Sequence, residues 1–421
     1  MILQRNIMQN IHEALADTPV ILLNGARQTG KSTLLESLVT TIPSAQYVTL
    51  DDATALASAH NNPEGFLAGF NGLLALDEIQ RAPELFLPLK REVDKNRKPG
   101  RFLLSGSANM MLLPKLSESL AGRMEIQTLF PFSQGELAGH SEHFLDSVFA
   151  QRFPHYSHKR NGKETLAQKM IIGGFPEVQL RKDDKRRNAW FKGYITTILQ
   201  RDVRDISNID GLTELPKLLS LLAARMGTIL NFAELSRSAA IPQTTLKRYL
   251  TLLQMTFLVQ LLPAWSGNLG KRLIKTPKIY LVDTGLVSHL LELNTNRLLL
   301  DGTLFGHLLE NFILLELCKQ SMWNNVKPAL YYLRTDAGQE IDFIIEHPDG
   351  RIAGIEVKAT HSVSADAFKG MNFLAEKLGK KFQRGIVLYL GTDVIPFGKN
   401  LHAMPFDVVW KLATESNKQR A

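Results

Sequence analysis

The stretch that decides the fold of the first part of the chain is Val20-Ile-Leu-Leu-Asn24 followed by Gly25-Ala-Arg-Gln-Thr-Gly-Lys-Ser-Thr33. The apolar run predicts a buried strand, and the residues after Ser32 predict a helix, so the glycine-containing segment joins a strand to a helix. Gly25 and Gly30 allow backbone N–H groups to turn inward and bind phosphate oxygens. The sequence therefore predicts an ATP site built from Gly25, Ala26, Arg27, Gln28, Thr29, Gly30, Lys31, Ser32 and Thr33.

Individual residues of this loop have separate predicted tasks. Lys31 is expected to reach the β and γ phosphates, and the hydroxyl of Ser32 is expected to bind Mg²⁺. The helix that begins near Lys31 directs its positive end at the same phosphates.

A second acidic element is needed to hold Mg²⁺ and to position the attacking water. The segment Leu73-Leu-Ala-Leu-Asp77-Glu78 supplies it, because an apolar strand ends there in two carboxylates. We assign Asp77 to the metal, directly or through water, and Glu78 to the role of general base.

Two further polar residues lie after the next predicted strand. Ser105 directly follows the run Arg101–Leu104, at the edge where parallel sheets bind ligands, and we interpret it as a γ-phosphate sensor. Arg123, in Leu120-Ala-Gly-Arg123, is predicted either to complete a neighbouring subunit's site or to form a surface salt bridge.

Alternating apolar runs and helical patterns over residues 1–140 predict an α/β domain with a parallel sheet. The expected strands are 20–24, 73–76 and 101–104, with a fourth at 47–50. The first 15 residues predict an amphipathic helix rather than an export signal.

Composition limits the class of protein. A chain of 421 residues predicts two or three domains, and 44% hydrophobic with 21% charged residues is typical of globular proteins. No apolar run is long enough to cross a membrane, and the single cysteine, Cys318, lies in an apolar helical pattern. We expect a soluble, cytoplasmic protein with no membrane partner.

Positive charge is concentrated in the middle of the chain. Between Arg160 and Lys278 there are 20 Lys or Arg and 9 Asp or Glu, a difference of +11, whereas the whole chain carries +8. Such asymmetry indicates an anionic partner, DNA first, although a solvated basic face would give the same count.

The middle of the chain is predicted to be helical. Residues 141–210 are interpreted as a lid-like insertion and helical linker, and residues 211–290 as a winged-helix-like domain. In this domain Asn231 caps the second helix and Pro242 opens a third, which carries Lys247 and Arg248. A basic β wing is expected around Lys271, Arg272, Lys275 and Lys278; the alternative is that the module only packs against other domains.

The last part, residues 300–421, contains a predicted hairpin over 339–359 that turns at His347-Pro-Asp-Gly350. Asp342 and Glu356 are equidistant from the turn and should lie opposite each other, and Glu356 and Lys358 should share a face. In the first strand, alternation places Ile341, Phe343 and Ile345 on the face opposite Asp342. Carboxylates beside a lysine are what metal-dependent phosphodiester cleavage requires, although charged strand residues also occur without a function.

Several motifs together resemble a prokaryotic family of AAA-type ATPases with a C-terminal domain of uncharacterised function. Besides the loop at 25–33, they are Leu76-Asp-Glu-Ile-Gln-Arg-Ala-Pro83, Leu104-Ser-Gly-Ser107, Leu120-Ala-Gly-Arg123, Gly173-Gly-Phe-Pro-Glu177, Lys278-Ile-Tyr-Leu-Val-Asp-Thr-Gly285 and Glu356-Val-Lys358.

The resemblance implies a P-loop AAA-type ATPase domain, a winged-helix-like middle and a C-terminal α/β domain similar to restriction endonucleases. It implies a homo-oligomer in which Arg123 acts as an arginine finger. It also adds Glu310 to Asp342, Glu356 and Lys358 as a possible second metal site. The resulting hypothesis is an ATPase that acts on DNA; the alternative is a regulatory ATPase that remodels or docks proteins through an inactive nuclease-like domain.

Overall fold

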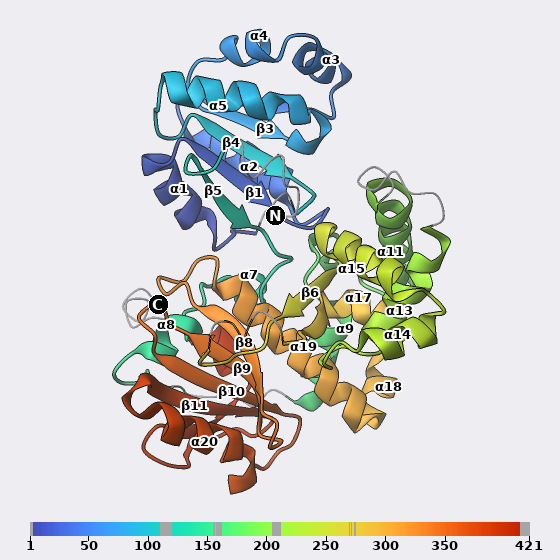
Figure 1. The fold of residues 1–421 in the computed structure, drawn as a ribbon, viewed down its shortest axis with the longest axis vertical. Helices are drawn as coiled ribbons and strands as arrows, with labels where there is room; N and C mark the ends of the chain where they lie inside the picture. The colour runs from blue at the N-terminus through green and yellow to red at the C-terminus, as the bar shows by residue number, and fades with distance from the viewer. Residues whose placement is uncertain are drawn as a thin grey trace. The chain divides into compact units, whose positions relative to one another are not determined.

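The computed structural model describes residues 3–109, 120–154, 156, 162–203, 212–268, 270, 272 and 275–412. The chain divides into two compact units (Figure 1). The first comprises Met1–Phe132, Phe175–Glu177 and Thr251–Leu258, and the second comprises Ser133–Gly174, Val178–Leu250 and Val259–Ala421.

The first unit is built on a five-stranded parallel sheet in the order β2-β3-β4-β1-β5. All side chains of the three central strands are buried, which explains their continuous apolar sequences. The strands are β1 (Val20–Asn24), β2 (Gln46–Thr49), β3 (Leu74–Asp77), β4 (Phe102–Gly106) and β5 (Met124–Thr128).

Helices pack against this sheet and complete its core. Helix α2 packs against β2, β3 and β4, and α1 packs against β1. The α-helices are α1 (Met8–Asp17), α2 (Lys31–Thr41), α3 (Ala53–Asn61), α4 (Pro63–Ala68) and α5 (Phe86–Lys95), with short 3₁₀ turns η1 (Ile79–Arg81) and η2 (Pro83–Leu85).

The four strands predicted for this unit are confirmed to within two residues at each end. The expected N-terminal helix begins at Met8, later than predicted. Strand β5 was not predicted, because its residues Met-Glu-Ile-Gln-Thr are mostly half-exposed at the edge of the sheet.

The second unit contains a six-stranded mixed sheet in the order β12-β13-β11-β10-β9-β8. Strands β8, β9 and β10 are antiparallel neighbours, whereas β10, β11 and β13 run parallel. The strands are β8 (Ala329–Arg334), β9 (Glu340–Glu346), β10 (Ile352–Lys358), β11 (Phe382–Tyr389), β12 (Ile395–Pro396) and β13 (Leu401–Pro405).

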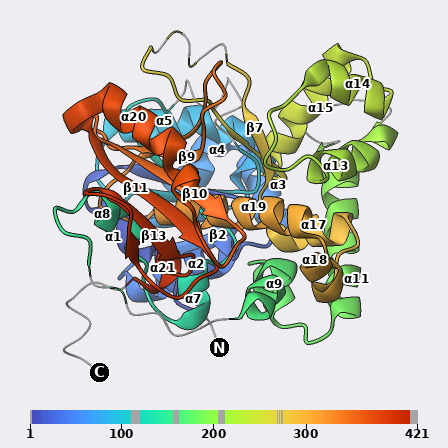
Figure 2. The ribbon, with the colours of Figure 1, turned by 90° about the horizontal axis from the view of Figure 1, so that it is seen from below.

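Helices cover this sheet as well. Helix α19 packs against β10, and α20 packs against β9 and β11 (Figure 2). From Leu308 to Gln320 every residue of α19 is buried, so this helix lies inside the unit rather than on its surface. The elements are α19 (Gly302–Gln320), η6 (Ala365–Phe368), α20 (Lys369–Leu378), η7 (Gly379–Lys381) and α21 (Val408–Lys411).

The middle of the chain forms helices followed by a two-stranded antiparallel sheet of β6 (Val259–Leu262) and β7 (Lys278–Leu281). The side chain of Asn231 accepts a hydrogen bond from the Glu234 N–H at 3.1 Å, which confirms the predicted cap. The helices here are α13 (Leu215–Ala223), α14 (Phe232–Ala239), α15 (Gln243–Met255), α17 (Thr284–Leu290) and α18 (Thr295–Leu300), preceded by η5 (Leu212–Glu214). Three helices therefore precede the two strands, and the winged-helix-like interpretation of this part remains a prediction.

The segment interpreted as a lid-like insertion is not a solvated loop where the structure describes it. Helix α8 is buried over most of its length and packs against β11. The segment contains α8 (Phe144–Phe149), α9 (Lys163–Ile172), α10 (Pro176–Gln179), α11 (Asp184–Thr197) and η4 (Ile198–Asp202), and α7 (Gln134–Ala138) precedes it. Among the described residues, no helix combines the length and the apolar character needed to traverse a lipid bilayer.

Candidate functional site

The predicted phosphate loop connects β1 directly to α2. Gly25 has φ 148° and Gly30 has φ 95°, both in the region that favours glycine. A Cβ atom at Gly25 would lie 2.3 Å from the Leu129 carbonyl oxygen, so no other residue fits there without movement. The loop therefore has the backbone shape that the sequence predicted.

Lys31 is buried at the start of α2, with 5% of its surface exposed. Its ammonium donates to the carbonyl oxygens of Gly25 at 3.0 Å and Ala26 at 2.9 Å. The charge thus lies over the loop that would enclose the phosphates, and it sits at the positive end of a helix.

Asp77 ends β3 and is held by two hydroxyl groups from neighbouring strands. The hydroxyl of Ser105, at the end of β4, donates to Asp77 Oδ1, and that of Tyr47, on β2, donates to Oδ2 at 2.9 Å. Burial, followed by the charge of Asp77, raises the pKa of Tyr47, so the tyrosine remains a hydrogen-bond donor. Both partners are uncharged donors, so neither of them forms an ion pair with the Asp77 carboxylate.

The oxygen donors here suit Mg²⁺, which prefers carboxylate, hydroxyl and water ligands. Asp77 supplies a buried carboxylate, and Ser32 supplies a half-buried hydroxyl in the first turn of α2. The residues present fit the metal that accompanies a bound nucleotide.

Glu78 adopts φ 57° and ψ 44°, a left-handed conformation that is uncommon for a residue with a side chain. Its carboxylate accepts hydrogen bonds from Gln80 and from Ser107 at 3.2 Å, while its N–H donates to Ser105 Oγ at 3.3 Å. Strained backbone of this kind occurs where surrounding contacts fix a side chain for a task. Gln80 and Ser107 were missed from the sequence, since neither has a charge or spacing that signals a role.

The structure places Ser105 and Arg123 in contacts within the first unit. Ser105 is fully buried against Asp77, and Arg123 Nε donates to Asp94 Oδ1 at 2.5 Å. The hydrogen bond and charge of Arg123 lower the pKa of Asp94. The salt bridge is the alternative that the sequence left open for Arg123; the sensor and arginine-finger roles remain predictions.

Arg5 was not predicted to contribute to the site, because it lies far from the loop in sequence. Its guanidinium donates to the carbonyl oxygens of Thr29 at 2.7 Å and Phe130 at 2.6 Å, and only 7% of the residue is exposed. Arg5 therefore ties the phosphate loop to the segment after β5.

In the second unit, the four residues predicted as a further site do come together. Lys358 Nζ donates to Glu356 Oε1 at 2.7 Å, and Asp342 exchanges contacts with the same strand: its Oδ2 accepts from the Val357 N–H at 2.9 Å. Glu310, on α19, joins them through Lys278, whose ammonium lies 3.1 Å from Glu310 Oε1 and 3.6 Å from Asp342 Oδ1. The group also includes Lys278, Tyr280 and Glu340, which the sequence did not assign to it.

The hairpin geometry explains how Asp342 and Glu356 meet. The β9–β10 ladder pairs Ile355 with Phe343, and the next pair in this register is Glu356 with Asp342, as predicted. There the side chains replace the ladder: Glu356 Oε2 accepts from the Asp342 N–H at 3.3 Å.

Strand β9 is less regular than its sequence predicts. Its pairing with β8 shifts register between Tyr331 and Leu333, and Ile341 and Ile344 join the same hydrophobic cluster. The predicted strict alternation is wrong at this point, because a bulge changes which residues share a face.

Burial and mutual repulsion dominate the acid–base properties of this cluster. Desolvation, with the charge of Asp342, raises the pKa of Glu310 to about 7 and that of Glu356 to about 8. Desolvation also raises the pKa of Asp342. Burial alone would lower the pKa of Lys278, but Glu310, Asp342 and Glu340 together raise it.

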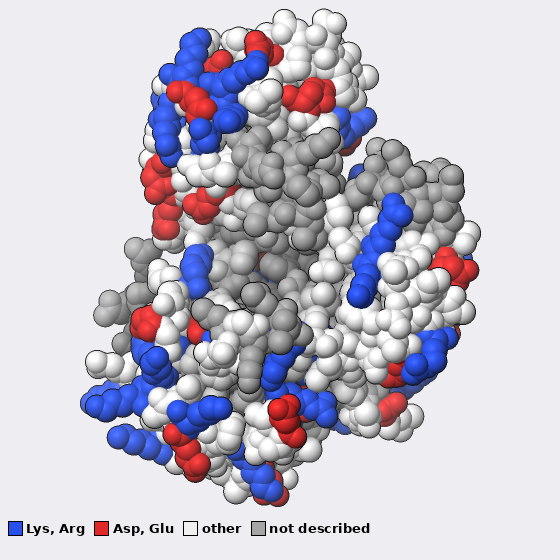
Figure 3. Space-filling model, viewed as in Figure 1, with Lys and Arg blue, Asp and Glu red and all other residues white. Residues whose placement is uncertain are grey.

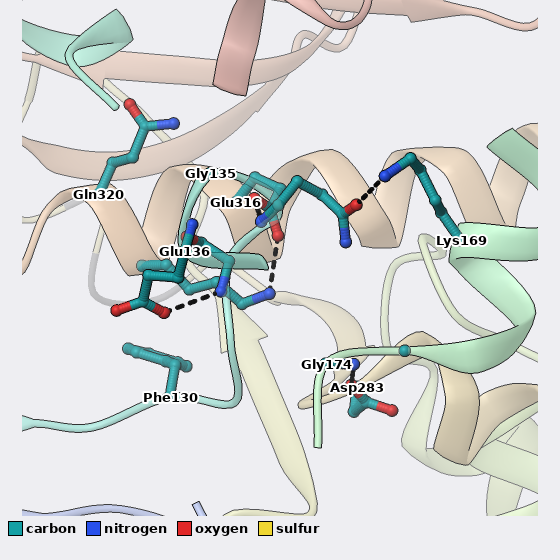
Figure 4. Close-up of polar contacts among 12 residues, drawn as sticks. Phe130, Gly135, Glu136, Lys169, Gly174, Asp283, Glu316 and Gln320 are labelled. Carbon is teal, nitrogen blue, oxygen red and sulfur yellow. Dashed lines mark hydrogen bonds and ion pairs between the residues drawn. The ribbon is translucent and has the colours of Figure 1, made fainter. Parts of the chain in front are cut away.

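Two motifs quoted for the family resemblance meet in the second unit and have a structural explanation. Asp283 accepts from the Gly174 N–H at 2.6 Å and caps α17 through the Leu286 N–H at 3.0 Å (Figure 4). Cβ atoms at Gly173 and Gly285 would lie 2.2 Å from Asp283 Oδ1 and 2.4 Å from the Ile172 oxygen, respectively. These glycines permit a close backbone approach that Asp283 then fixes.

A second buried polar group surrounds the start of α7. Glu316 accepts from the Gln134 N–H at 2.9 Å and from Lys319 at 2.7 Å, whereas Glu142 accepts from the Gly135 N–H at 2.7 Å (Figure 4 shows Gly135 and Glu316). Burial and the charge of Glu316 raise the pKa of Glu142 to about 8.

The basic residues of the middle segment do not all face solvent. Arg272 forms a bidentate pair with Glu346 at 2.6 and 3.1 Å, and Lys278 is buried among carboxylates. These two were expected on a DNA-binding wing, and that expectation is wrong for Lys278; Lys271 lies outside the described residues. On the face drawn in Figure 3, the described Lys and Arg side chains lie in separate groups with Asp and Glu among them.

Comparison with known proteins gives the relationship of this chain. It is 32% identical to uncharacterized proteins of Mycobacterium bovis and Mycobacterium tuberculosis over 411 residues, covering 97% of this chain and 85% of each relative. The chain belongs to the family of these mycobacterial proteins. A more distantly similar uncharacterized protein, from Methanocaldococcus jannaschii, is 26% identical over 65% of this chain and 58% of its own length.

Family models divide the sequence into three parts. An AAA domain matches residues 17–138, and two domains of unknown function, DUF8612 and DUF4143, match residues 163–297 and 305–409. An AAA-type ATPase domain is therefore present at the N-terminal side. The restriction-endonuclease-like expectation has no counterpart among these models.

Among solved structures, AMPPCP-bound DnaA from Aquifex aeolicus is similar at 15% identity and a TM-score of 0.29, covering 58% of this chain and 86% of DnaA. A similarity of this size supports no inference about the present chain.

Proposed function

We propose that this protein binds and hydrolyses ATP at the carboxyl edge of its parallel sheet and uses this reaction to act on DNA. The ATPase part rests on one observation: Lys31 follows β1, Asp77 ends β3 with Glu78 directly after it, and Ser105 lies near the end of β4. The registers of these strands bring their carboxyl ends together. Open parallel sheets bind their ligands at this edge.

Each residue has a role that follows from its position. The loop N–H groups and Lys31 bind the phosphates, and Asp77 and Ser32 hold Mg²⁺, which when bound neutralises phosphate charge. Glu78, held by Gln80 and Ser107, orients the attacking water and takes its proton. Arg123 would act in a neighbouring subunit of an oligomer if its salt bridge with Asp94 opened.

The DNA part of the proposal rests on α15, the third helix of the middle segment. Thr244, Lys247, Arg248 and Thr251 are exposed and spaced as one helical face, opposite the buried Leu246, Leu250 and Leu253. A polar face with two cations on the third helix of such a module is suited to a DNA groove.

The experiment for the whole proposal measures the ATPase rate with and without single-stranded, duplex and branched DNA. We expect hydrolysis to depend on Mg²⁺ and to increase with at least one DNA. Absence of Mg²⁺-dependent hydrolysis under all conditions would remove the proposed activity.

DNA contact by α15 has a separate test. Replacing Lys247 and Arg248 by Ala should lower the slope of log K against log salt by about 2, since each phosphate contact contributes about one unit. In the matched control, two exposed lysines of α20, Lys369 and Lys377, are replaced by Ala, and this change should leave the slope unchanged.

A second candidate is a regulatory ATPase that remodels or docks proteins. It is favoured by the internal pairing of Arg272 with Glu346 and of Lys278 with Glu310, which removes two cations from DNA contact. DNA binding that is weak and independent of salt, together with ATPase activity unaffected by DNA, would support this candidate.

A further inference from the structure

Lys278 lies in the middle of the acidic cluster of the C-terminal sheet. Its ammonium is 3.0 Å from Glu340 Oε1, 3.1 Å from Glu310 Oε1 and 3.6 Å from Asp342 Oδ1. These carboxylates come from α19 and β9, whereas the lysine comes from β7, and only 3% of it is exposed. One buried cation therefore neutralises carboxylates from two other elements.

The backbone fixes Lys278 in this position from both sides. Strand β7 pairs with β6 through Lys278 and Leu262, and Lys278 also forms an isolated bridge with Ile229. The adjacent Ile279 accepts from the Gly227 N–H at 2.8 Å and donates to the Thr228 oxygen at 3.0 Å. The backbone of Lys278 is therefore held in place by strand pairing, and the ammonium can leave the carboxylates only if the side chain changes its conformation.

Tyr280 reinforces the arrangement from the same strand. Two residues beyond Lys278, it shares the lysine's face of β7, and its hydroxyl donates to Glu310 Oε1 at 2.6 Å. Glu310 thus receives a charged and a neutral donor on one oxygen, both from β7. This is the pattern of a satisfied buried ion pair.

A divalent metal does not fit this arrangement. Mg²⁺ and Ca²⁺ require oxygen ligands at about 2.0–2.6 Å, but Glu310 Oε1 and Asp342 Oδ1 already face the Lys278 ammonium, at 3.1 and 3.6 Å. Among the described residues, no group of three or more His, Cys, Asp or Glu side chains is placed to hold a metal ion. Of the carboxylates that a nuclease-like resemblance would assign to a metal, Glu310 and Asp342 contact Lys278, and Glu356 contacts Lys358.

We infer that Lys278 is the resident cation of this cluster, so the C-terminal sheet binds β7 of the middle segment through it and does not carry a catalytic divalent metal. The cluster then has a structural task, since carboxylates that would repel one another are held by a lysine from a distant segment. This inference is independent of the proposed ATP hydrolysis, because the nucleotide site shares none of these residues.

The test is Mn²⁺ binding to the full-length protein without nucleotide, followed by the electron paramagnetic resonance signal of free Mn²⁺. Wild type and Asp342→Asn are compared, with Glu356→Gln as a second carboxylate variant, and circular dichroism verifies that each is folded. Mn²⁺ held elsewhere contributes equally to all three proteins. We expect equal binding; one equivalent of Mn²⁺ bound by wild type and lost in the folded carboxylate variants would overturn the inference.

Substitution of Lys278 provides the complementary measurement. Lys278→Met leaves the carboxylates without their cation, and we expect a lower melting temperature that Mn²⁺ partly restores, whereas Mn²⁺ should not affect wild type. Lys358→Met is the matched control, because that lysine is 40% exposed and pairs with Glu356, whereas Lys278 is buried among Glu310, Glu340 and Asp342. If Lys278→Met melted like wild type and Lys358→Met did not, Lys278 would not be the cluster's cation.

Discussion

The nucleotide site and the C-terminal cluster both contain carboxylates on strands and a buried lysine, but different groups contact the carboxylates in the two regions. At the nucleotide site, Asp77 is held by the hydroxyls of Ser105 and Tyr47, and Lys31 donates to backbone carbonyls of its own loop. In the C-terminal cluster, Lys278 contacts the carboxylates of Glu310 and Glu340 directly.

The difference separates an arrangement ready for a ligand from one that is complete in itself. Neutral donors orient Asp77 without forming an ion pair with it, so a metal cation that accompanies a triphosphate can still pair with this carboxylate. An ammonium among carboxylates satisfies the charges internally, and a buried pair of this kind is costly to open. A carboxylate at the end of a strand therefore suits metal binding at the nucleotide site, whereas the carboxylates around Lys278 form a buried ion-pair network.

The largest expected effect is that of Lys31→Ala, which should reduce ATP turnover to background. Loss of the lysine removes the charge that binds the β and γ phosphates. The measurement is phosphate release under saturating ATP and Mg²⁺. Lys358→Ala, the corresponding change in the C-terminal cluster, should leave turnover intact; unchanged hydrolysis by Lys31→Ala would refute the site assignment.

Glu78→Gln should lower kcat by roughly 100-fold while nucleotide affinity changes little, because general bases contribute about that factor or more. Single-turnover hydrolysis and fluorescent-nucleotide binding separate the two quantities. Glu356→Gln is the counterpart in the second unit and should leave both unaffected. A loss of nucleotide binding in Glu78→Gln would contradict a role as base.

Arg5→Lys should weaken ATP binding about tenfold, since hydrogen bonds from a charged group contribute about 1.5–3 kcal/mol and lysine cannot reach two carbonyls with a fixed fork. Arg101 offers a matched control, because it also donates to two backbone carbonyls, those of Phe70 and Gly72, away from the loop. Arg101→Lys should keep the affinity. Equal loss in both variants would indicate general destabilisation rather than loop positioning.

The smallest expected effect concerns pH. The folded state raises the pKa of Glu142 to about 8 by burial and by the charge of Glu316, so folded protein binds the proton more tightly than unfolded protein. The contribution of this group to stability therefore declines as pH rises from about 4.5 to about 8. Glu142→Gln should raise the melting temperature by a few degrees at pH 9 and hardly at all at pH 5.

Glu316→Gln sharpens this prediction. Glu316 forms an ion pair with the buried Lys319, so removing its charge should destabilise the protein at both pH values. Thermal melts of the two variants at pH 5 and pH 9 test the contrast; similar pH dependence in both would contradict it.

Much of the nucleotide site could be predicted from sequence because it is local. A strand, a glycine-dependent loop and a helix follow one another at 20–41, and Asp77 directly ends an apolar run. The contribution of Arg5 could not be predicted, since it depends on a contact across more than a hundred residues with Phe130.

In the C-terminal cluster, the contacts within the hairpin could be predicted from sequence, but the contacts of Lys278 could not. Symmetry about the turn predicted the meeting of Asp342 and Glu356, and the spacing of Glu356 and Lys358 predicted their pairing. Lys278 was interpreted as a surface cation because a lysine has the same appearance in sequence whether it faces solvent or a buried acid. Its partners are contributed by residues at least 32 positions away, and no local pattern encodes that pairing.

The segment from Lys278 to Asp283 is anchored at both ends: the lysine enters the acidic cluster, and the aspartate fixes Gly174. Dividing the chain near residue 300, where the sequence models change, would separate Glu310, Glu340 and Asp342 from the only positive charge that reaches all three within the described residues. We therefore expect residues 305–409 to unfold together with β7, although the two segments match different family models.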